Sequence, residues 1–527
     1  MDTPGIATAD PYPNASPPDS STRRVPGSAR AIALIGGAQA LVLVGGLVRW
    51  KIAAVYLGPS GVGLAGVIDQ VAVVVLQLGS LNMPTVALRF LAIARTSGGP
   101  AFGRLYRGFM AIVLAGCAAT AACAALLFFV RPALVADELI PHRVAVFIAL
   151  GIVPFTAVVN LLRNVLSTLD RHKDMAKAMV ASALLTAVAS LIGVRAGGLA
   201  GLYIASLVAT LIIAMVLYVS VARDPRVAGS GGGFSMAALR EHPAALRFAA
   251  ALYTVGFTVP LAYSVVRSSV LDSFGPEAAG YLAASYTIAT GARLSFAQAS
   301  IQYLLPRASR VAPKEVRANE VAVYLHTLAV AMALVALPVA LFPREVLLVL
   351  FSPRFTAAVS FVGLFLLAEL MMAFGDAYRT LLIGFDDMAG YVATTLTAPL
   401  AVMAGVVLVV PRYGIIGAGW VQICAAVVAL AMSLARLKSR HGTAPDPRAL
   451  LYYAVMIAII GAATAAGELA PGPSASARLG KVLLGVLLGA LAIALLPPAE
   501  RAALVRFFPL PSRLTERFRT SRSRPEP

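Results

Sequence analysis

Three cations lie inside stretches of sequence that are otherwise apolar, each a short distance before a Gly-Pro step. Arg49 and Lys51 come nine and seven residues before Gly58-Pro59, and Arg267 comes eight residues before Gly275-Pro276. A buried cation costs about 2.5–3.5 kcal/mol on membrane-insertion scales and is usually retained where it meets water, a counter-ion or a ligand. Arginine offers phosphate bidentate donors and lysine offers a point charge. These residues therefore predict a cationic cavity that binds a phosphate-bearing ligand.

A structural interpretation competes with this one. Each cation could extend its charge to the membrane surface or pair with a buried acid. Arg49 and Lys51 are two residues apart and cannot share one face of a helix. We therefore expect Lys51 and Arg267 to line the cavity and Arg49 to have a different role.

Four further ionisable residues lie in apolar stretches. Arg293 and Asp69 lie at similar depths in their stretches, which leaves an ion pair between the two halves of the chain possible, or a role in binding ligand or ion. Glu369 and Asp376 are seven residues apart and share nearly the same helix face. Glu369 could carry a proton or pair with a cavity arginine, whereas Asp376 lies beside Arg379 and favours a local ion pair.

The elements that position these residues are predicted to be membrane spans. Of the 527 residues, 59% are hydrophobic and only 13% are charged, which indicates an all-α integral membrane protein. A span needs about 20 mostly apolar residues. This rule predicts fourteen spans, at about 30–56, 62–87, 107–130, 144–168, 174–194, 198–222, 247–272, 278–305, 319–342, 356–384, 388–410, 414–436, 449–468 and 479–497.

The Gly-Pro steps indicate an internal repeat. Each belongs to a Gly-Pro-x-x-x-Gly cassette, Gly58–Gly63 and Gly275–Gly280, and the cassettes lie 217 residues apart. Six predicted spans separate them, so the two halves share one orientation. We therefore expect two six-helix lobes related by an axis along the membrane normal, followed by a C-terminal helix pair.

Basic residues in the predicted loops set the orientation. With the N-terminus inside, 31 of the 43 Lys and Arg fall on the inner side and 8 on the outer side, which favours cytoplasmic termini. Anionic lipid at that face accounts for most of the net charge of +19 without a nucleic-acid partner. The predicted organisation is a disordered tail at 1–27, an N-lobe at 28–222, a linker at 223–246, a C-lobe at 247–440, the last two spans at 441–500 and a basic tail at 501–527.

Other functional classes have little support in the sequence. The three cysteines, Cys117, Cys123 and Cys424, lie in apolar stretches and form no metal or redox motif. The five histidines form no zinc pattern, and no nucleophile elbow or phosphate-binding loop is present. We expect no catalytic residue, no metal and no cofactor, and therefore a protein that is not an enzyme.

Several segments resemble one transporter family. Leu57–Ala65, Val259–Arg267, Gln302–Arg307 and Phe351–Ala357 are similar, in order and spacing, to segments of the Wzx-type O-antigen and enterobacterial-common-antigen flippases. Those proteins belong to the multidrug/oligosaccharidyl-lipid/polysaccharide (MOP) superfamily. The resemblance covers roughly residues 30–440. Many relatives have twelve spans, whereas this chain is predicted to have fourteen.

The resemblance implies a V of two lobes that work by alternating access. Lys51 and Arg267 match basic positions of the family and Glu369 an acidic one, whereas Arg49, Asp69 and Arg293 have no clear match. The implied cargo is an undecaprenyl-diphosphate-linked oligosaccharide, flipped across the bacterial inner membrane with possible proton coupling through Glu369. Implied partners are membrane lipid and polysaccharide polymerase and chain-length machinery.

Two alternatives remain. A drug or cation antiporter of the same superfamily would favour an acidic cavity. A membrane polysaccharide polymerase or ligase would usually carry a large outward loop, which the short predicted loops do not provide.

Overall fold

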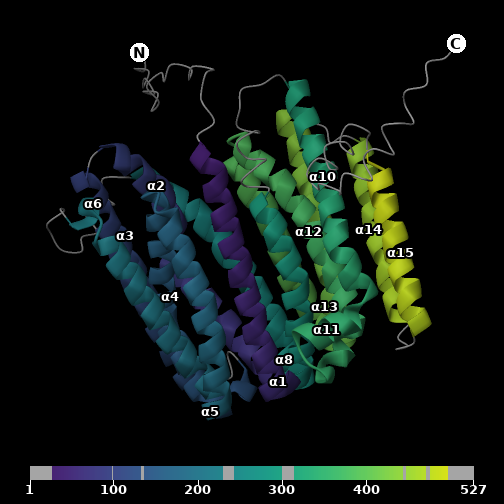
Figure 1. Ribbon diagram of the computed structural model, residues 1–527, viewed down its shortest axis with the longest axis horizontal. Helices are drawn as coiled ribbons and strands as arrows, with labels where there is room; N and C mark the ends of the chain where they lie inside the picture. Colours follow the sequence, from purple (N-terminus) through teal and green to yellow (C-terminus); the bar gives the residue numbers. More distant parts are fainter. Residues whose placement is uncertain are drawn as a thin grey trace, which may run out of the picture.

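The computed structural model describes residues 26–97, 99–131, 136–228, 243–299, 314–442, 447–469 and 475–496. Regular structure in this part of the chain is entirely helical (Figure 1). Most of both predicted tails and of the predicted linker lies outside the described residues. The α-helices are α1 (Pro26–Ser80), α2 (Met83–Ser97), α3 (Gly99–Val130), α4 (Arg143–Thr168), α5 (His172–Ala222), α6 (Pro225–Ala228), α8 (Pro243–Ala299), α10 (Lys314–Leu341), α11 (Pro343–Leu350), α12 (Val359–Gly384), α13 (Met388–His441), α14 (Pro447–Leu469) and α15 (Ala475–Ala494), and the 3-10 helices are η2 (Asp137–His142) and η4 (Pro353–Ala358).

Ten of the described helices are long and apolar enough to cross a membrane, which identifies a multi-pass membrane protein. Four of them, α1, α5, α8 and α13, have between 51 and 57 residues. At 1.5 Å per residue, each exceeds twice the roughly 30 Å thickness of the hydrocarbon core. Counting each of the four as two spans gives the fourteen that the sequence predicts.

Each double-length helix is interrupted at a glycine, where the chain folds back on itself. The backbone φ is 69° at Gly58, 80° at Gly275, 56° at Gly198 and 60° at Gly414. The accompanying ψ values lie at or near a region that only glycine adopts readily. Gly58 and Gly275 are 217 residues apart, and Gly198 and Gly414 are 216 residues apart. The internal repeat therefore includes two glycine turns in each half of the chain.

Two features of the helices differ from the sequence-based prediction. The second span was expected to continue to residue 87, but α1 ends at Ser80. Leu81 and Asn82 then take positive φ values of 49° and 54°, and α2 starts as a separate helix. Asparagine tolerates that conformation, and Asn82 accepts a hydrogen bond from the Thr85 hydroxyl at 2.8 Å. The short helices α11 and η4 were also not predicted; each begins with a proline, Pro343 or Pro353.

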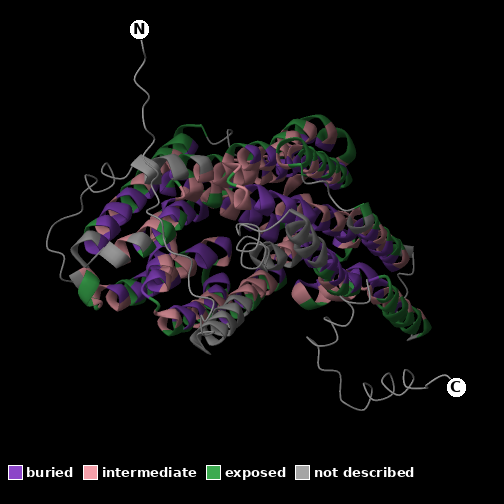
Figure 2. Cartoon of the chain, turned by 90° about the horizontal axis from the view of Figure 1, so that it is seen from above, coloured by how far each residue is buried: buried purple, intermediate pink, exposed green. Residues whose placement is uncertain are grey.

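The helices form two groups (Figure 1). The N-lobe contains α1 to α6, the C-lobe contains α8 to α13, and α14 and α15 pack on α10 and α12 of the C-lobe. The two lobes pack together where α1 and α8 are labelled (Figure 1). They also stay in contact further along, because the Gln70 amide donates to the Pro260 carbonyl oxygen at 2.9 Å and the Asn82 amide to that of Leu252 at 3.1 Å. From above, buried residues lie inside each group and exposed residues lie at the rim (Figure 2). Exposed apolar side chains such as Phe129 (73%) and Leu408 (71%) suit contact with lipid.

The two Gly-Pro cassettes pack against each other where the lobes converge. A Cβ atom on Gly63 would lie 2.0 Å from the carbonyl oxygen of Pro276, and one on Gly280 would lie 2.0 Å from that of Pro59. Reciprocal contacts between equivalent residues indicate a two-fold axis. Since both turns lie at the same end of their helices, this axis runs along the helices, which confirms the parallel repeat.

Candidate functional site

Within the N-lobe, Arg49 and Asp69 face each other across the Gly58 turn of α1. The Arg49 guanidinium donates to both carboxylate oxygens of Asp69, at 2.7 and 3.2 Å. The Tyr203 hydroxyl, from α5, donates to Asp69 Oδ1 at 2.8 Å. Arg49 also lies over the ring of Trp50, 5.4 Å from its centroid. Arg49 therefore neutralises Asp69 within one lobe. Arg49 lines the N-lobe cavity described next, whose lining includes neither Lys51 nor Arg267, contrary to the cavity lining expected from the sequence.

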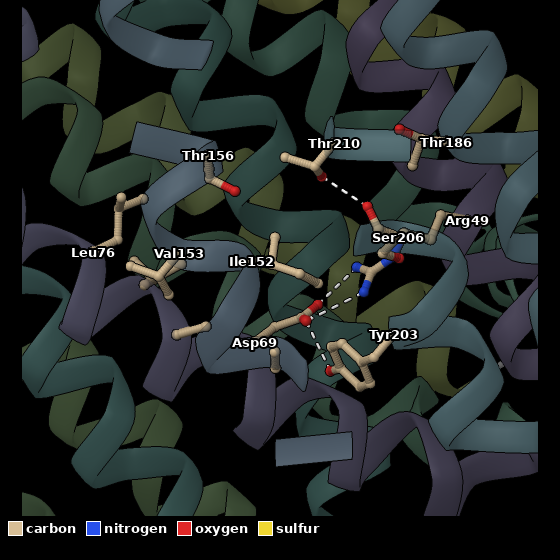
Figure 3. A pocket seen from close by; sticks show the side chains of 13 residues that line it. Arg49, Asp69, Leu76, Ile152, Val153, Thr156, Thr186, Tyr203, Ser206 and Thr210 are labelled. Carbon is tan, nitrogen blue, oxygen red and sulfur yellow. Dashed lines mark hydrogen bonds and ion pairs between the residues drawn. The ribbon is translucent and has the colours of Figure 1, made fainter. Parts of the chain in front are cut away.

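This ion pair lies at one end of a cavity of about 320 Å³ between α1, α4 and α5 (Figure 3). One wall is apolar, with Leu76, Ile152 and Val153. Hydroxyl groups of Thr156, Thr186, Ser206 and Thr210 also line it. The cavity is thus large, mixed in character and without net charge.

In the C-lobe, two arginines and two carboxylates form a compact cluster. Arg293 Nε lies 2.6 Å from a carboxylate oxygen of Glu369, and its Nη1 lies 3.2 Å from Asp376. Arg379 donates to Asp376 at 2.5 Å. Glu369 is only 1% exposed and Arg379 4%. The local pair expected between Asp376 and Arg379 is present, and Glu369 pairs with an arginine.

Glu369 also accepts hydrogen bonds from uncharged side chains. The Tyr263 hydroxyl donates to it at 3.0 Å and the Gln422 amide at 2.7 Å. Tyr286 donates to Gln422 Oε1 at 2.7 Å, which holds the amide in place. The cavity beside this network is small, about 60 Å³. The C-lobe centre is therefore filled with polar groups that contact one another, while Arg293 Nε, Glu369 Oε2 and Arg379 Nη1 make no hydrogen bond among the described residues.

Arg267 lies between the two lobes. It projects from α8 and donates from Nη1 to the carbonyl oxygen of Gly66 in α1, at 2.5 Å. Its Nε atom is buried and lacks a hydrogen-bond partner among the described residues. No carboxylate among the described residues lies within 4.0 Å of its guanidinium. Arg267 thus retains an uncompensated positive charge at the lobe interface.

Lys51 binds backbone at the face where the lobes converge. Its Nζ atom donates to the carbonyl oxygen of Leu348 at 2.8 Å, in the last turn of α11, where a cation is favoured by the helix dipole. Nearby, the Ser352 hydroxyl lies 3.5 Å from the carbonyl oxygen of Ala54. Lys51 therefore links the N-lobe to the C-lobe in this structure.

The structure separates the seven candidate residues into four places. Arg49 and Asp69 share the N-lobe centre, and Arg293, Glu369 and Asp376 share the C-lobe centre. Arg267 and Lys51 each lie alone at the interface. Asp69 and Arg293, for which an ion pair across the two halves was possible, are instead paired within their own lobes.

Sequence reasoning missed the tyrosines and the glutamine that surround the carboxylates. The repeat contains a signal for two of them. Tyr286 comes eleven residues after Gly275, as Asp69 does after Gly58, and Gln422 comes eight residues after Gly414, as Ser206 does after Gly198. Polar residues at equivalent points of a repeat identify the centre of each lobe.

Metal chemistry finds no support in the described part of the chain, where His, Cys, Asp and Glu form no group of three or more suited to a metal ion. Cys117 is buried, whereas Cys123 and Cys424 are exposed, and all three are free thiols.

Comparison with known proteins identifies the fold. No protein family and no curated protein matches the sequence. Among solved structures, the lipid II flippase MurJ in an inward closed conformation matches with a TM-score of 0.67 and 12% identity, over 87% of this chain and 98% of MurJ. An inward-facing multidrug-resistance MATE transporter of the MOP superfamily matches with a TM-score of 0.58 and 17% identity, over 76% of this chain and 96% of that one. The MATE multidrug transporter DinF-BH matches with a TM-score of 0.58 and 14% identity, over 80% and 97%.

The chain has the fold of the MOP-superfamily transporters. These similarities confirm the expected all-helical membrane fold with two related lobes and a C-terminal helix pair. At such low identity, they establish the fold alone.

Proposed function

We propose that this protein is a flippase that moves a lipid-linked diphosphate oligosaccharide from the cytoplasmic to the outer leaflet of a bacterial inner membrane. The observation that carries the proposal is the uncompensated charge of Arg267 at the lobe interface. The other arginines of the two lobe centres are neutralised by Asp69, Glu369 and Asp376. A buried cation with donors to spare suits a diphosphate.

The proposed path runs between the two lobes. The lobes pack tightly at the Gly58 and Gly275 turns. At the other end, which the loop charges assign to the cytoplasm, the hydrogen bond from Asn82 to the Leu252 carbonyl oxygen joins them and would have to open to admit cargo. Cargo would enter between the lobes from that side and meet Arg267. Rocking of one lobe against the other would then expose it to the outer leaflet. The lipid tail would stay in the bilayer.

A drug or cation antiporter is the alternative, since MATE transporters are among the matched structures. Binding of a cationic drug would favour a carboxylate without a cationic partner. Asp69, Glu369 and Asp376 each have an arginine partner, so the charges favour an anionic cargo.

The test is a flipping assay in proteoliposomes that contain undecaprenyl-diphosphate-linked saccharide. Arg267→Gln removes the charge and keeps a polar amide of shorter reach at this position. A charge-assisted hydrogen bond contributes about 1.5–3 kcal/mol, so we expect flipping to fall at least about tenfold. Arg195→Gln is the matched control, because Arg195 is an exposed arginine bonded only to Tyr56 among the described residues. Equal flipping by wild type and Arg267→Gln would overturn the role of Arg267.

A further inference from the structure

The N-lobe cavity differs from its C-lobe counterpart in size. The two lobes repeat each other, yet the cavities measure about 320 and 60 Å³. Side-chain size at equivalent positions explains part of the difference. Tyr286 and Gln422 occupy the C-lobe positions where the N-lobe has Asp69 and Ser206. The larger volume falls within the range of small-molecule sites, about 300–1,000 Å³.

The cavity wall suits a neutral ligand rich in hydroxyl groups. The hydroxyls of Thr156 and Thr186 face the cavity (Figure 3) and have no hydrogen-bond partner among the described residues. Ser206 and Thr210 donate to their own helix backbone and keep lone pairs that can accept. Arg49 and Asp69 neutralise each other through two contacts. The Asp69 carboxylate would repel an anionic ligand and the Arg49 guanidinium would repel a cationic one. An uncharged polar ligand therefore fits best.

The cavity adjoins the place proposed for the diphosphate. Arg267 donates to the carbonyl oxygen of Gly66, and Asp69 lies three residues further along α1. Three residues of helix correspond to a rise of about 4.5 Å. Tyr203 bridges this turn, since its hydroxyl contacts both the carbonyl oxygen of Ala65 and Asp69. A group attached directly to a diphosphate at Arg267 would therefore reach the charged end of the cavity.

We infer that the cavity between α1, α4 and α5 binds the sugar unit attached to the diphosphate, through neutral hydroxyl contacts. This inference rests on the proposed flippase function and adds to it a place for the sugar. The apolar wall of Leu76, Ile152 and Val153 would take the less polar face of the sugar ring. Thr156 and Thr186 would hydrogen-bond to its hydroxyls.

The test compares two probes on the full-length protein in nanodiscs: undecaprenyl diphosphate alone, and undecaprenyl diphosphate carrying N-acetylglucosamine. We expect wild type to bind the sugar-bearing probe about tenfold more tightly, which corresponds to about 1.4 kcal/mol or one to two net hydrogen bonds. Thr156→Val with Thr186→Val keeps the side-chain volume and removes both hydroxyls. This double variant should bind the two probes within threefold of each other, with unchanged affinity for undecaprenyl diphosphate.

Two further variants make the test specific. Ser206→Gln introduces the residue of the equivalent C-lobe position, should fill part of the cavity, and should also remove the preference for the sugar. Thr397→Val is the matched control, because Thr397 is a half-buried threonine of α13 outside the cavity; the preference should stay tenfold. An unchanged preference in the double variant, or no preference in wild type, would overturn the sugar site. No binding of either probe by wild type would instead contradict the proposed function.

Discussion

At the residue scale, the C-lobe centre depends on a balance of buried charges. Glu369 forms an ion pair with Arg293 and accepts hydrogen bonds from Tyr263 and Gln422 at its other oxygen, so its charge has a cationic partner. Removing one member of a buried ion pair leaves its partner unpaired in a medium of low dielectric constant. The resulting loss in the free energy of unfolding is larger than the net contribution of the pair itself. The network therefore fixes the relative positions of α8, α12 and α13.

Glu369→Gln should destabilise the protein strongly. The substitution keeps the size of the side chain but leaves Arg293 with Asp376 as its remaining carboxylate partner among the described residues. We expect a loss of about 3–5 kcal/mol in the free energy of unfolding. Unfolding in mixed micelles, followed by circular dichroism, would measure it.

Asp170→Asn is the control for this substitution. Asp170 also pairs with an arginine, Arg95, but its side chain is 62% exposed. Exposed ion pairs contribute at most about 1 kcal/mol, so the loss should be small. A loss in Glu369→Gln no larger than in Asp170→Asn would contradict the role assigned to the buried network.

The partners of these charges could be only partly predicted from the sequence. Counting residues gives the depth of a side chain in the membrane but not the direction in which it points around the helix. Asp69 and Arg293 lie at similar depths yet pair with Arg49 and Glu369. The pair of Asp376 with Arg379 was predictable because three residues of helix bring two side chains together without tertiary packing.

At the element scale, the close approach of α1 and α8 depends on two glycines. Gly63 and Gly280 are the last residues of the two cassettes, and each faces the carbonyl oxygen of the other lobe's proline. The cassettes were predictable from the sequence as a repeat. Their direct contact was not, because a repeat specifies equivalent positions and leaves open which of them meet.

Gly63→Ala should push the lobes apart at this contact. Its new Cβ would lie 2.0 Å from the Pro276 carbonyl oxygen, a distance that only a shift of backbone can relieve. Overpacking of this kind costs about 1–3 kcal/mol, which thermal unfolding in detergent would detect.

Gly46→Ala provides the control on the same helix. A Cβ at Gly46 would meet no atom within 4 Å, and alanine favours helix over glycine, so stability should stay equal or rise. If Gly63→Ala behaved like Gly46→Ala, the contact between cassettes would not hold the lobes together.

At the scale of the whole molecule, the lobes are joined most closely at one end. An apolar cluster from both lobes lies there, with Ala54 and Val62 from α1, Ala284 from α8, and Leu347 and Phe351 from the α11 segment. The bond from Lys51 to Leu348 reinforces it. In the proposed function, release of cargo to the outer leaflet would require these surfaces to separate, and this end would be the closed gate.

Joining Ala54→Cys to Ser352→Cys should stop transport. Ser352 Oγ lies 3.5 Å from the Ala54 carbonyl oxygen, and both residues are buried, so the two introduced thiols are joined directly by oxidation to a disulfide. The native thiols Cys117, Cys123 and Cys424 are first replaced by alanine. Because the linked lobes cannot part at this face, we expect flipping to fall at least about tenfold and to return after the link is reduced.

A second cysteine pair tests whether flipping is lost because this face cannot open or because any cross-link makes the protein rigid. Thr397→Cys with Met432→Cys joins the two halves of α13 inside one lobe, where the native side chains lie 3.2 Å apart. If the lobes move as rigid bodies, this link leaves flipping intact. Full activity with Ala54→Cys and Ser352→Cys joined would mean that cargo leaves without separation of this face. Loss of activity with the α13 link would mean instead that the C-lobe must deform internally, because a rigid lobe is unaffected by a bond within it.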